Sequence, residues 1–376
     1  MQAPALDRER LRELARLRSG DGVGLSLFLD LDPERFATPP SRRSQITSLL
    51  DQAHRSAEGM ELEHNQRMTI RRRIEEAREA LADGSLFERA HGLGLFIGFN
   101  GQRAIRLPAV LAPEVSIDEM PLIRPLLPAE AEDRWCVVLV SRTNGRFLTG
   151  DERALSERID VRDDVHGKHD QGGWSQARYQ RSVEEEFRRH LDRVAGVALR
   201  LHESERFDQL LIGGTEENAS ALLDQLDSPL SSIYAGRFAV EVDDAGPDEV
   251  LKLASARMEE HRGEALARLR AELQEALGTG GPAVAGLEPT LEAINERRVR
   301  ELLAAREIDS PGGRCPRCDL LSTAQTSTCP LDGSPLAQRA RILDDAIRKA
   351  IGDSAEVRLL QTAAEAPSGI AALTHY

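Results

Sequence analysis

The sequence predicts an α/β protein of three domains, each a mixed sheet flanked by helices. The chain has 376 residues, which corresponds to two or three domains at roughly 100 to 200 residues each. Apolar runs with strand character alternate with helical patterns along the chain, as expected for sheets covered by helices. Two joints rich in proline or glycine, at 125–134 and 278–286, interrupt these patterns. We therefore expect domains at 1–130, 131–280 and 281–376.

The first domain is predicted to alternate helices with strands. After an opening helix comes the apolar run VGLSLFLDLD, and GLGLFIGF later turns at Asn100-Gly101 into AIRLPAVL, which is typical of a hairpin. Between them, Met68, Ile74 and Leu81 lie at helical spacing and predict a stripe that faces the core. The expected elements are a strand at 23–32, helices at 44–57 and 61–81, and hairpin strands at 92–99 and 104–111.

The middle domain is predicted to contain a hairpin, a long polar loop and then alternating helices and strands. WCVVLV is an apolar strand, and Asn144-Gly145 before RFLTG signals a second hairpin. After the loop, apolar residues from Val183 to Leu201 line one face of a helix. The remaining expected elements are strands at 208–214 and 237–243 and helices at 217–226 and 248–277.

The third domain is predicted to be a small α/β unit with a cysteine-bearing insertion. The insertion covers 312–335. Around it, the patterns predict helices at 289–306 and 338–351 and strands at 355–361 and 369–376.

Composition limits the class of protein. Hydrophobic residues make up 40% of the chain, and no run approaches the ~18 to 20 apolar residues of a membrane span. The N-terminal stretch is charged and lacks the apolar core of a secretory signal, so we expect a soluble, cytoplasmic protein without a membrane partner. The formal charge of −14 argues against a general nucleic-acid coat, so any RNA contact is expected to be local.

The segment HGKHDQGGWSQARYQR, at 166–181, is the most informative part of the sequence. Its paired glycines allow positive φ and a close approach of the backbone to a ligand, and Trp174 is one of only two tryptophans. On composition alone, the segment also fits a surface loop before a helix that starts near Ser175 or Ser182.

This segment resembles the loop of archaeal and eukaryotic class I peptide-chain release factors, in which Gly-Gly-Gln and an Arg-aromatic pair precede a long helix of the middle domain. Gly172-Gly173 and the pair at 178–179 match that form, while Trp174 stands at the glutamine position. A branch related to Vms and the ankyrin-zinc-finger hydrolase, with bacterial relatives, has a Gly-x-x-Gln loop. The run GWSQ fits this pattern and supplies Gln176 as the glutamine. The resemblance extends to the three-domain architecture, the block order and the final strand.

The resemblance implies hydrolysis of peptidyl-tRNA on the ribosome. In this hypothesis Gly172 and Gly173 give a thin loop access to the ester, and the Gln176 amide positions or excludes water while a backbone N–H stabilises the oxyanion. The implied partners are the ribosome, through rRNA and the acceptor end of peptidyl-tRNA, and a translational GTPase. The implied RNA-binding residues are Lys168, His169, Trp174, Arg178 and Arg181.

The first domain lacks the motifs that release factors use to read stop codons. Neither an Asn-Ile-Lys-Ser string nor a Tyr-x-Cys-x-x-x-Phe string occurs, so decoding of stop codons is not expected. The function favoured by Gln176 is stop-codon-independent rescue by peptidyl-tRNA hydrolysis. Trp174 favours the alternative, a non-catalytic A-site binder resembling Pelota or the bacterial hibernation factors. A third alternative is a protein-interaction scaffold that is unrelated to ribosomes. Arginines 42–43 and 71–73 either contact RNA phosphates or lie on a solvated helix face.

The C-terminal cysteines predict a metal site. Cys315-Pro-Arg-Cys318 and Cys329-Pro-Leu-Asp332 place ligands three apart around two tight turns, as in the halves of a zinc ribbon. Asp332 takes the fourth position, and zinc accepts a carboxylate oxygen. Four protein ligands leave no open position, so the zinc would be structural. A degenerate knuckle that binds no metal is the alternative, and a disulfide framework is not expected.

Overall fold

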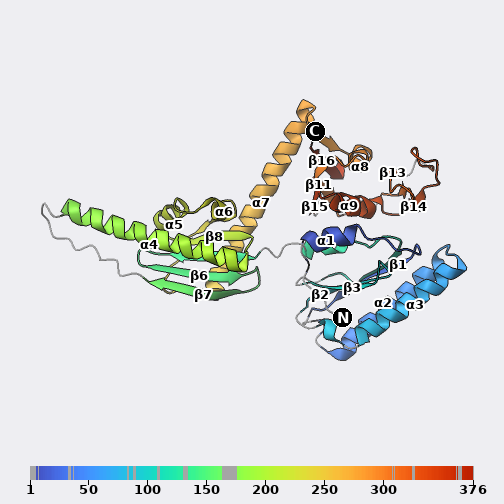
Figure 1. Ribbon diagram of the computed structural model, residues 1–376, viewed down its shortest axis with the longest axis horizontal. Helices are drawn as coiled ribbons and strands as arrows, with labels where there is room; N and C mark the ends of the chain where they lie inside the picture. Colours follow the sequence, from blue (N-terminus) through green and yellow to red (C-terminus); the bar gives the residue numbers. More distant parts are fainter. Residues whose placement is uncertain are drawn as a thin grey trace. The chain divides into compact units, whose positions relative to one another are not determined.

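A computed structural model of the chain describes residues 6–375, except 7, 33–34, 37, 83, 88–89, 108–110, 130–133, 163–175, 307, 309, 324–326, 361 and 363–365. For 128–129 and 176–180 it describes the backbone alone. The described residues form two compact units (Figure 1). One unit combines the two ends of the chain, 1–130 and 270–376, and the other comprises 131–269. The α/β class predicted from the sequence is confirmed.

The N-terminal part of the first unit is a four-stranded antiparallel sheet covered by two long helices. The strand order is β3-β2-β1-β4. Asn100 and Gly101 have φ of 58° and 115°, as the turn between β2 and β3 requires, so the predicted hairpin is confirmed. The elements are α1 (Arg8–Ala15), β1 (Gly24–Asp30), α2 (Pro39–Gly59), α3 (His64–Ala82), β2 (Gly92–Ile97), β3 (Gln102–Leu107) and β4 (Glu114–Asp118).

Side chains of β1 alternate between two cores. Leu25, Leu27 and Leu29 pack against α2 and α3, whereas Phe28 faces the other side and meets Phe96 edge-on at 5.7 Å between ring centroids. The predicted stripe on α3 is wrong at one position, because Met68 is 53% exposed. Ile70 is fully buried and belongs to the stripe instead, because it lies four residues, about one helical turn, before the buried Ile74.

The C-terminal part of the first unit is a mixed sheet with a small three-stranded sheet beside it. The main order is β10-β16-β11-β15, with β11 and β15 parallel, and the small sheet has the order β13-β12-β14. The predicted helix at 289–306 is wrong in its second half. It ends at Asn295, Arg297 follows with φ 57°, and the chain continues as β11, whose apolar residues are buried on both faces. The elements are β10 (Ala283–Ala285), α8 (Leu287–Asn295), β11 (Val299–Ala305), β12 (Gly312–Arg314), β13 (Leu321–Thr323), β14 (Ala337–Arg339), α9 (Ile342–Gly352), β15 (Glu356–Leu360) and β16 (Ile370–Thr374).

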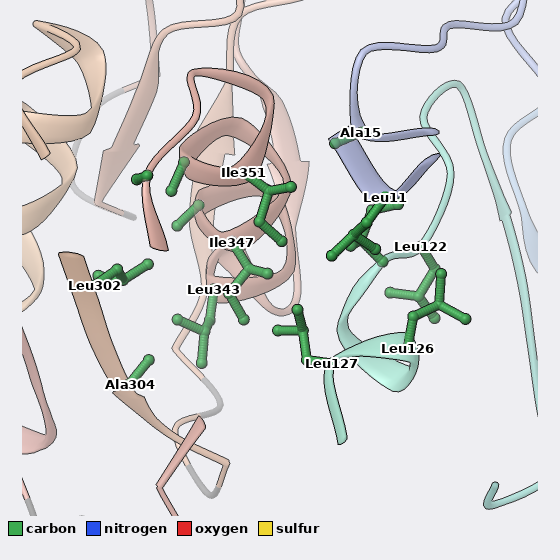
Figure 2. Close-up of a cluster of buried hydrophobic side chains, with 14 of the residues drawn as sticks. Leu11, Ala15, Leu122, Leu126, Leu127, Leu302, Ala304, Leu343, Ile347 and Ile351 are labelled. Carbon is green, nitrogen blue, oxygen red and sulfur yellow. The ribbon is translucent and has the colours of Figure 1, made fainter. Parts of the chain in front are cut away.

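One hydrophobic core joins the two ends of the chain. Figure 2 shows Leu11 of α1 and Leu126 and Leu127 of the segment after β4 on one side, with Leu343 and Ile347 of α9 opposite them. The first joint seen in the sequence therefore places two buried leucines in the core. Because apolar burial is the dominant favourable term in folding, we infer that the N-terminal and C-terminal parts stabilise one another.

The second unit is a mixed five-stranded sheet between helices. The order is β7-β6-β5-β8-β9, with β5, β8 and β9 parallel. Cys136, Val138 and Val140 of β5 face α4 and α5, whereas Val137 and Leu139 face α7. The elements are β5 (Trp135–Val140), β6 (Asn144–Gly150), β7 (Leu155–Arg162), α4 (Gln176–Glu205), β8 (Gln209–Gly214), α5 (Glu216–Leu223), α6 (Ser228–Ser231), β9 (Tyr234–Phe238) and α7 (Pro247–Thr279), whose last residues belong to the first unit.

Two details of the second unit differ from the sequence prediction. The hairpin between β5 and β6 exists, but its turn lies just before Asn144, where the Ser141 N–H donates to the Asn144 carbonyl at 2.8 Å. Strand β9 is predicted at 237–243 and is found at Tyr234–Phe238. Among the described residues, none of the helices combines the length and the apolar character that a membrane crossing requires.

Candidate functional site

The predicted catalytic loop falls mostly outside the described residues. Lys168, His169, Gly172, Gly173 and Trp174 lie within 163–175, which the structure does not describe. The two ends of this segment are described: β7 ends at Arg162, and α4 begins at Gln176. Gln176 is therefore the first residue of a helix of 30 residues, about 45 Å long at 1.5 Å per residue. The side chains of Gln176 and Arg178 also lie outside the described part, and Arg181 is exposed.

The start of α4 differs electrostatically from those of α5 and α7. α5 carries Glu216 and Glu217 in its first turn and α7 carries Asp248 and Glu249, whereas the first turn of α4 has no acidic residue. Acidic side chains normally offset the partial positive charge at a helix N-terminus. Without them, the start of α4 suits an anionic ligand such as an RNA phosphate.

The body of α4 is packed firmly on the sheet. Val183 is the first buried side chain described along the helix, and Leu191, Val194 and Ala198 continue the buried face. A Cβ on Gly145 would lie 2.6 Å from a methyl group of Val194, so β6 and α4 approach closely only because position 145 is glycine. In Figure 1 the N-terminal end of α4 lies beyond the strands of this sheet. The helix is thus anchored by its middle, and its first residues extend outward.

A groove of about 320 Å³ lies between the end of β7 and the exposed side of α4. Val161, Gly196 and Val197 form its apolar lining, and Asp192, Arg193 and Arg200 line it with charge. It opens next to the residue at which β7 stops. Asp192 lies among these arginines, so the groove carries charges of both signs.

The arginines of the first domain divide into exposed and structural residues. Arg43, Arg71 and Arg72 are exposed. Arg73 is buried, and its guanidinium donates to both carboxylate oxygens of Asp21 at 2.7 Å. Arg42 donates to the Phe36 carbonyl at 2.7 Å. Arg73 is therefore a structural residue that ties α3 to the segment before β1, and it is not available to RNA.

The two cysteine turns repeat one backbone pattern. In the first turn, the Cys315 N–H donates to the Leu320 carbonyl at 2.8 Å and the Asp319 N–H donates to the Cys315 carbonyl at 3.1 Å. The second turn has the same pair of bonds, from Cys329 to Ser334 at 2.7 Å and from Gly333 to Cys329 at 2.9 Å. The residues at the fifth position, Asp319 and Gly333, both have positive φ, 58° and 70°. Asp332 consequently occupies the place in its turn that Cys318 occupies in the first.

The four predicted ligands lie together in one cluster. Their ligand atoms all lie within 4.8 Å of one another. Cys318 Sγ is 3.5 Å from Cys329 Sγ, and Cys315 Sγ is 3.4 Å from Asp332 Oδ2. Around a tetrahedral zinc ion, bond lengths of about 2.3 Å to sulfur and about 2.0 Å to oxygen give edges of about 3.8 Å and about 3.5 Å. The residues present therefore fit a metal ion of this class.

The protonation of the cluster agrees with a site that needs a cation. Burial raises the pKa of the Cys315 thiol, but hydrogen bonds from the Cys318 and Arg317 backbone leave it below its ordinary value. Burial and the neighbouring thiols raise the pKa of Cys318 to about 11. The Ser334 backbone lowers the pKa of Asp332 to about 2. A second thiolate here is costly without a positive ion, because the ligand atoms crowd one another.

The structure also brings together charged residues that sequence reasoning missed. Arg314, which precedes the first ligand, is 2% exposed and faces Asp118 and Glu119 of the N-terminal part at 3.2 Å each. Its Nε lies 3.5 Å from the buried carboxylate of Asp345. No local pattern reveals this set, because its members lie far apart in the chain.

One family model matches the middle of the chain. Residues 121–259 match the sequence profile of bacterial archaeo-eukaryotic release factor family 10. The match contains β5 to β9, the segment 163–175 and α4. The relationship to archaeo-eukaryotic release factors indicated by the sequence is confirmed, whereas the assignment to the Vms-related branch stays a prediction. No curated protein matches the chain.

Several solved structures are similar to this chain at low identity. The archaeal translation termination factor aRF1 is 16% identical over 99% of both chains, with a TM-score of 0.27. Pelota of Archaeoglobus fulgidus is 18% identical and Dom34 of S. cerevisiae 10% identical, each over 76% of this chain and 79% of theirs, with TM-scores of 0.33 and 0.41. At such values the likeness carries no argument about activity.

Proposed function

We propose that the protein is a release-factor-like ribosomal factor that acts without a stop codon and hydrolyses peptidyl-tRNA in the A site. The family match over 121–259 is the observation that carries this proposal, because it contains the whole loop and the helix behind it. The position of Gln176 at the first residue of α4 supports it. A loop held on a firmly packed helix delivers its end reproducibly into a crowded RNA pocket.

In this proposal the loop acts on the ester that links the peptide to tRNA. Gly172 and Gly173 let the backbone approach the ester carbonyl, and the Gln176 amide orients a water molecule towards it. A backbone N–H donates to the oxyanion that forms, and the tRNA 3′ oxygen leaves with a proton. Water supplies the oxygen of the new peptide carboxylate, so no cofactor is consumed.

The same proposal assigns the remaining loop residues to RNA. Lys168, Arg178 and Arg181 would contact phosphates, and His169 and Trp174 would stack on or hydrogen-bond to bases. The absence of acids from the first turn of α4 supports this assignment. Delivery by a translational GTPase stays a prediction.

A release assay on stalled peptidyl-tRNA complexes tests the catalytic role. Gln176→Ala is expected to lower the release rate by about 100-fold or more, the scale reached when one group that orients or stabilises the reaction is lost. Gln180→Ala, the same change one turn further along α4, is the matched control and should retain release. Release by Gln176→Ala at the rate of the control would contradict the proposal.

Trp174 favours a second candidate function, occupation of the A site without hydrolysis. An indole at the position of the signature glutamine can stack on a base and hold the loop in place. Sedimentation with 70S ribosomes separates the two candidates when it is combined with the release assay. Association without release selects the non-catalytic function, and absence of association excludes both.

We further propose that the ligands Cys315, Cys318, Cys329 and Asp332 hold one structural zinc ion. The tetrahedral spacing and the repeated turn pattern support this assignment. When bound, zinc would join the two turns and supply no chemistry to the loop. Protein purified without chelator should contain about one equivalent of zinc by mass spectrometry, and Cys329→Ser should contain almost none. Less than about 0.3 equivalents in the unmodified chain would contradict the assignment.

A further inference from the structure

The first cysteine turn contacts the N-terminal part of the chain directly. The guanidinium of Arg18, just after α1, donates to the Pro316 carbonyl between the first two ligands. The same guanidinium is paired with Glu119, at the end of β4, and this hydrogen bond raises the pKa of Arg18. Arg18 therefore joins the turn to two segments of the N-terminal part.

A second contact passes through Asp319, the residue after the second ligand. Arg348 of α9 donates to both oxygens of the Asp319 carboxylate, at 2.8 and 2.7 Å, and to the Ala15 carbonyl of α1 at 3.3 Å. Its side chain is only 7% exposed, so this arginine is largely removed from water. Lys349 also donates to the Asp319 carbonyl, at 2.7 Å. The turn, α9 and the end of α1 thus form one connected set.

Asp319 distinguishes the first cysteine turn from the second. It has φ of 58°, a conformation that non-glycine residues rarely adopt, and the equivalent residue of the second turn is Gly333. The carboxylate of Asp319 accepts hydrogen bonds from Arg348, which a glycine at this position could not do. Only the turn that faces the N-terminal part carries it.

We propose that metal binding at the cysteine cluster holds the N-terminal part of the chain against the C-terminal part, through the Arg18–Pro316 contact and through Arg348, which joins Asp319 to the Ala15 carbonyl. The inference rests on the proposed zinc site. Metal bound to Cys315 and Cys318 sets the path of the peptide between them and hence the positions of the Pro316 carbonyl and the Asp319 carboxylate. Loss of the metal frees this peptide, so the two contacts weaken together.

Hydrogen exchange of the full chain tests this link. Cys329→Ser removes a ligand from the second turn, which makes neither contact, and should release zinc. Amides of residues 8–20 are then expected to exchange about 10-fold faster, because loss of hydrogen bonds to charged groups lowers the local opening free energy. The strand Gly92–Ile97 lies in the same unit and makes neither contact, so an unchanged exchange rate there shows that the unit is still folded. Chelator-treated unmodified protein provides the same measurement without a substitution.

Asp319→Gly tests the contact without removing a ligand. Glycine accepts positive φ, so the turn should keep one equivalent of zinc, yet residues 8–20 should exchange faster. Arg8→Ala is the control, because its ion pair with Glu356 joins the same parts but is exposed, and it should change nothing.

The outcomes test the metal site and its coupling to residues 8–20 separately. Zinc loss with exchange of residues 8–20 within about twofold of the unmodified chain would overturn the link and leave the metal site standing. Asp319→Gly with zinc retained and exchange unchanged would also overturn the link. Absence of zinc from the unmodified chain would overturn both.

Discussion

Replacing Arg314 by alanine is expected to destabilise the first unit strongly and leave the second unchanged. The Arg314 side chain is 3% exposed and is the positive partner of Asp118, Glu119 and Asp345. Asp345 is itself 2% exposed, so its charge has little water to replace the lost partner. Removing one member of a buried ion pair costs about 3 to 5 kcal/mol. Arg339 still pairs with Asp345 at 2.7 Å, which places the expected loss near about 3 kcal/mol.

The two tryptophans provide an assay that separates the units. Trp135 and Trp174 both belong to 131–269, so tryptophan fluorescence follows the second unit, while far-UV circular dichroism follows both. At about 2 to 4 °C per kcal/mol, Arg314→Ala should lower the Tm seen by circular dichroism by roughly 6 to 12 °C. The Tm seen by fluorescence should not move.

An exposed arginine supplies the control for this prediction. Arg8 pairs with Glu356 across the same two parts of the chain, with exposed fractions of 69% and 49%. Arg8→Ala should therefore change stability by less than about 0.5 kcal/mol. A loss of less than about 1 kcal/mol for Arg314→Ala would refute the reasoning that the buried charges depend on this arginine.

Three further predictions concern other contacts. Gly145→Ala brings a Cβ within 2.6 Å of Val194 and should destabilise the second unit by about 1 to 3 kcal/mol, measured by fluorescence-detected urea unfolding; an unchanged midpoint would show that α4 shifts freely. The hydrogen bond from Arg146 lowers the pKa of Glu157, so its stabilisation is present above the unfolded pKa of about 4.3 and is lost as pH falls through the folded pKa. Unfolding midpoints between pH 5 and 3 should fall more steeply for the unmodified chain than for Glu157→Gln, and parallel curves would contradict this. Asp332→Cys completes four thiolates and should slow zinc transfer to a chelator by about 10-fold, whereas equal rates would show that the carboxylate is no weaker a ligand.

Local spacing and turn chemistry predicted much of this molecule. Asn100-Gly101 specified a hairpin, since these residues adopt the positive φ of its turn more readily than most, and the two cysteine turns were indicated by predicted ligands three residues apart. The segment at 166–181 was singled out by its glycines and its resemblance, and it lies within the family match over 121–259. Its catalytic and RNA-binding residues stay predictions.

The errors occur where distant packing overrides local preference. The run VRELLAA carries good helix formers, yet it is a strand because its apolar residues are buried on both faces between neighbouring strands. Gly145 fits a turn in the sequence, but it pairs within β6, and its missing Cβ leaves room for Val194, 49 positions further along. Met68 fits a helical stripe but lies on the solvent side of α3.

The amino-acid order was enough to indicate the α/β class and to single out the four residues that cluster at the cysteine turns, because these features depend on residues close together in the chain. The joining of 1–130 with 270–376 into one unit was decided by folding alone. Arg124 reaches Asp344 across 220 positions, and Arg314 reaches Asp118 across 196. Such pairs leave no periodic trace in the sequence, since their spacing follows from how whole sheets and helices pack and not from the geometry of any single element.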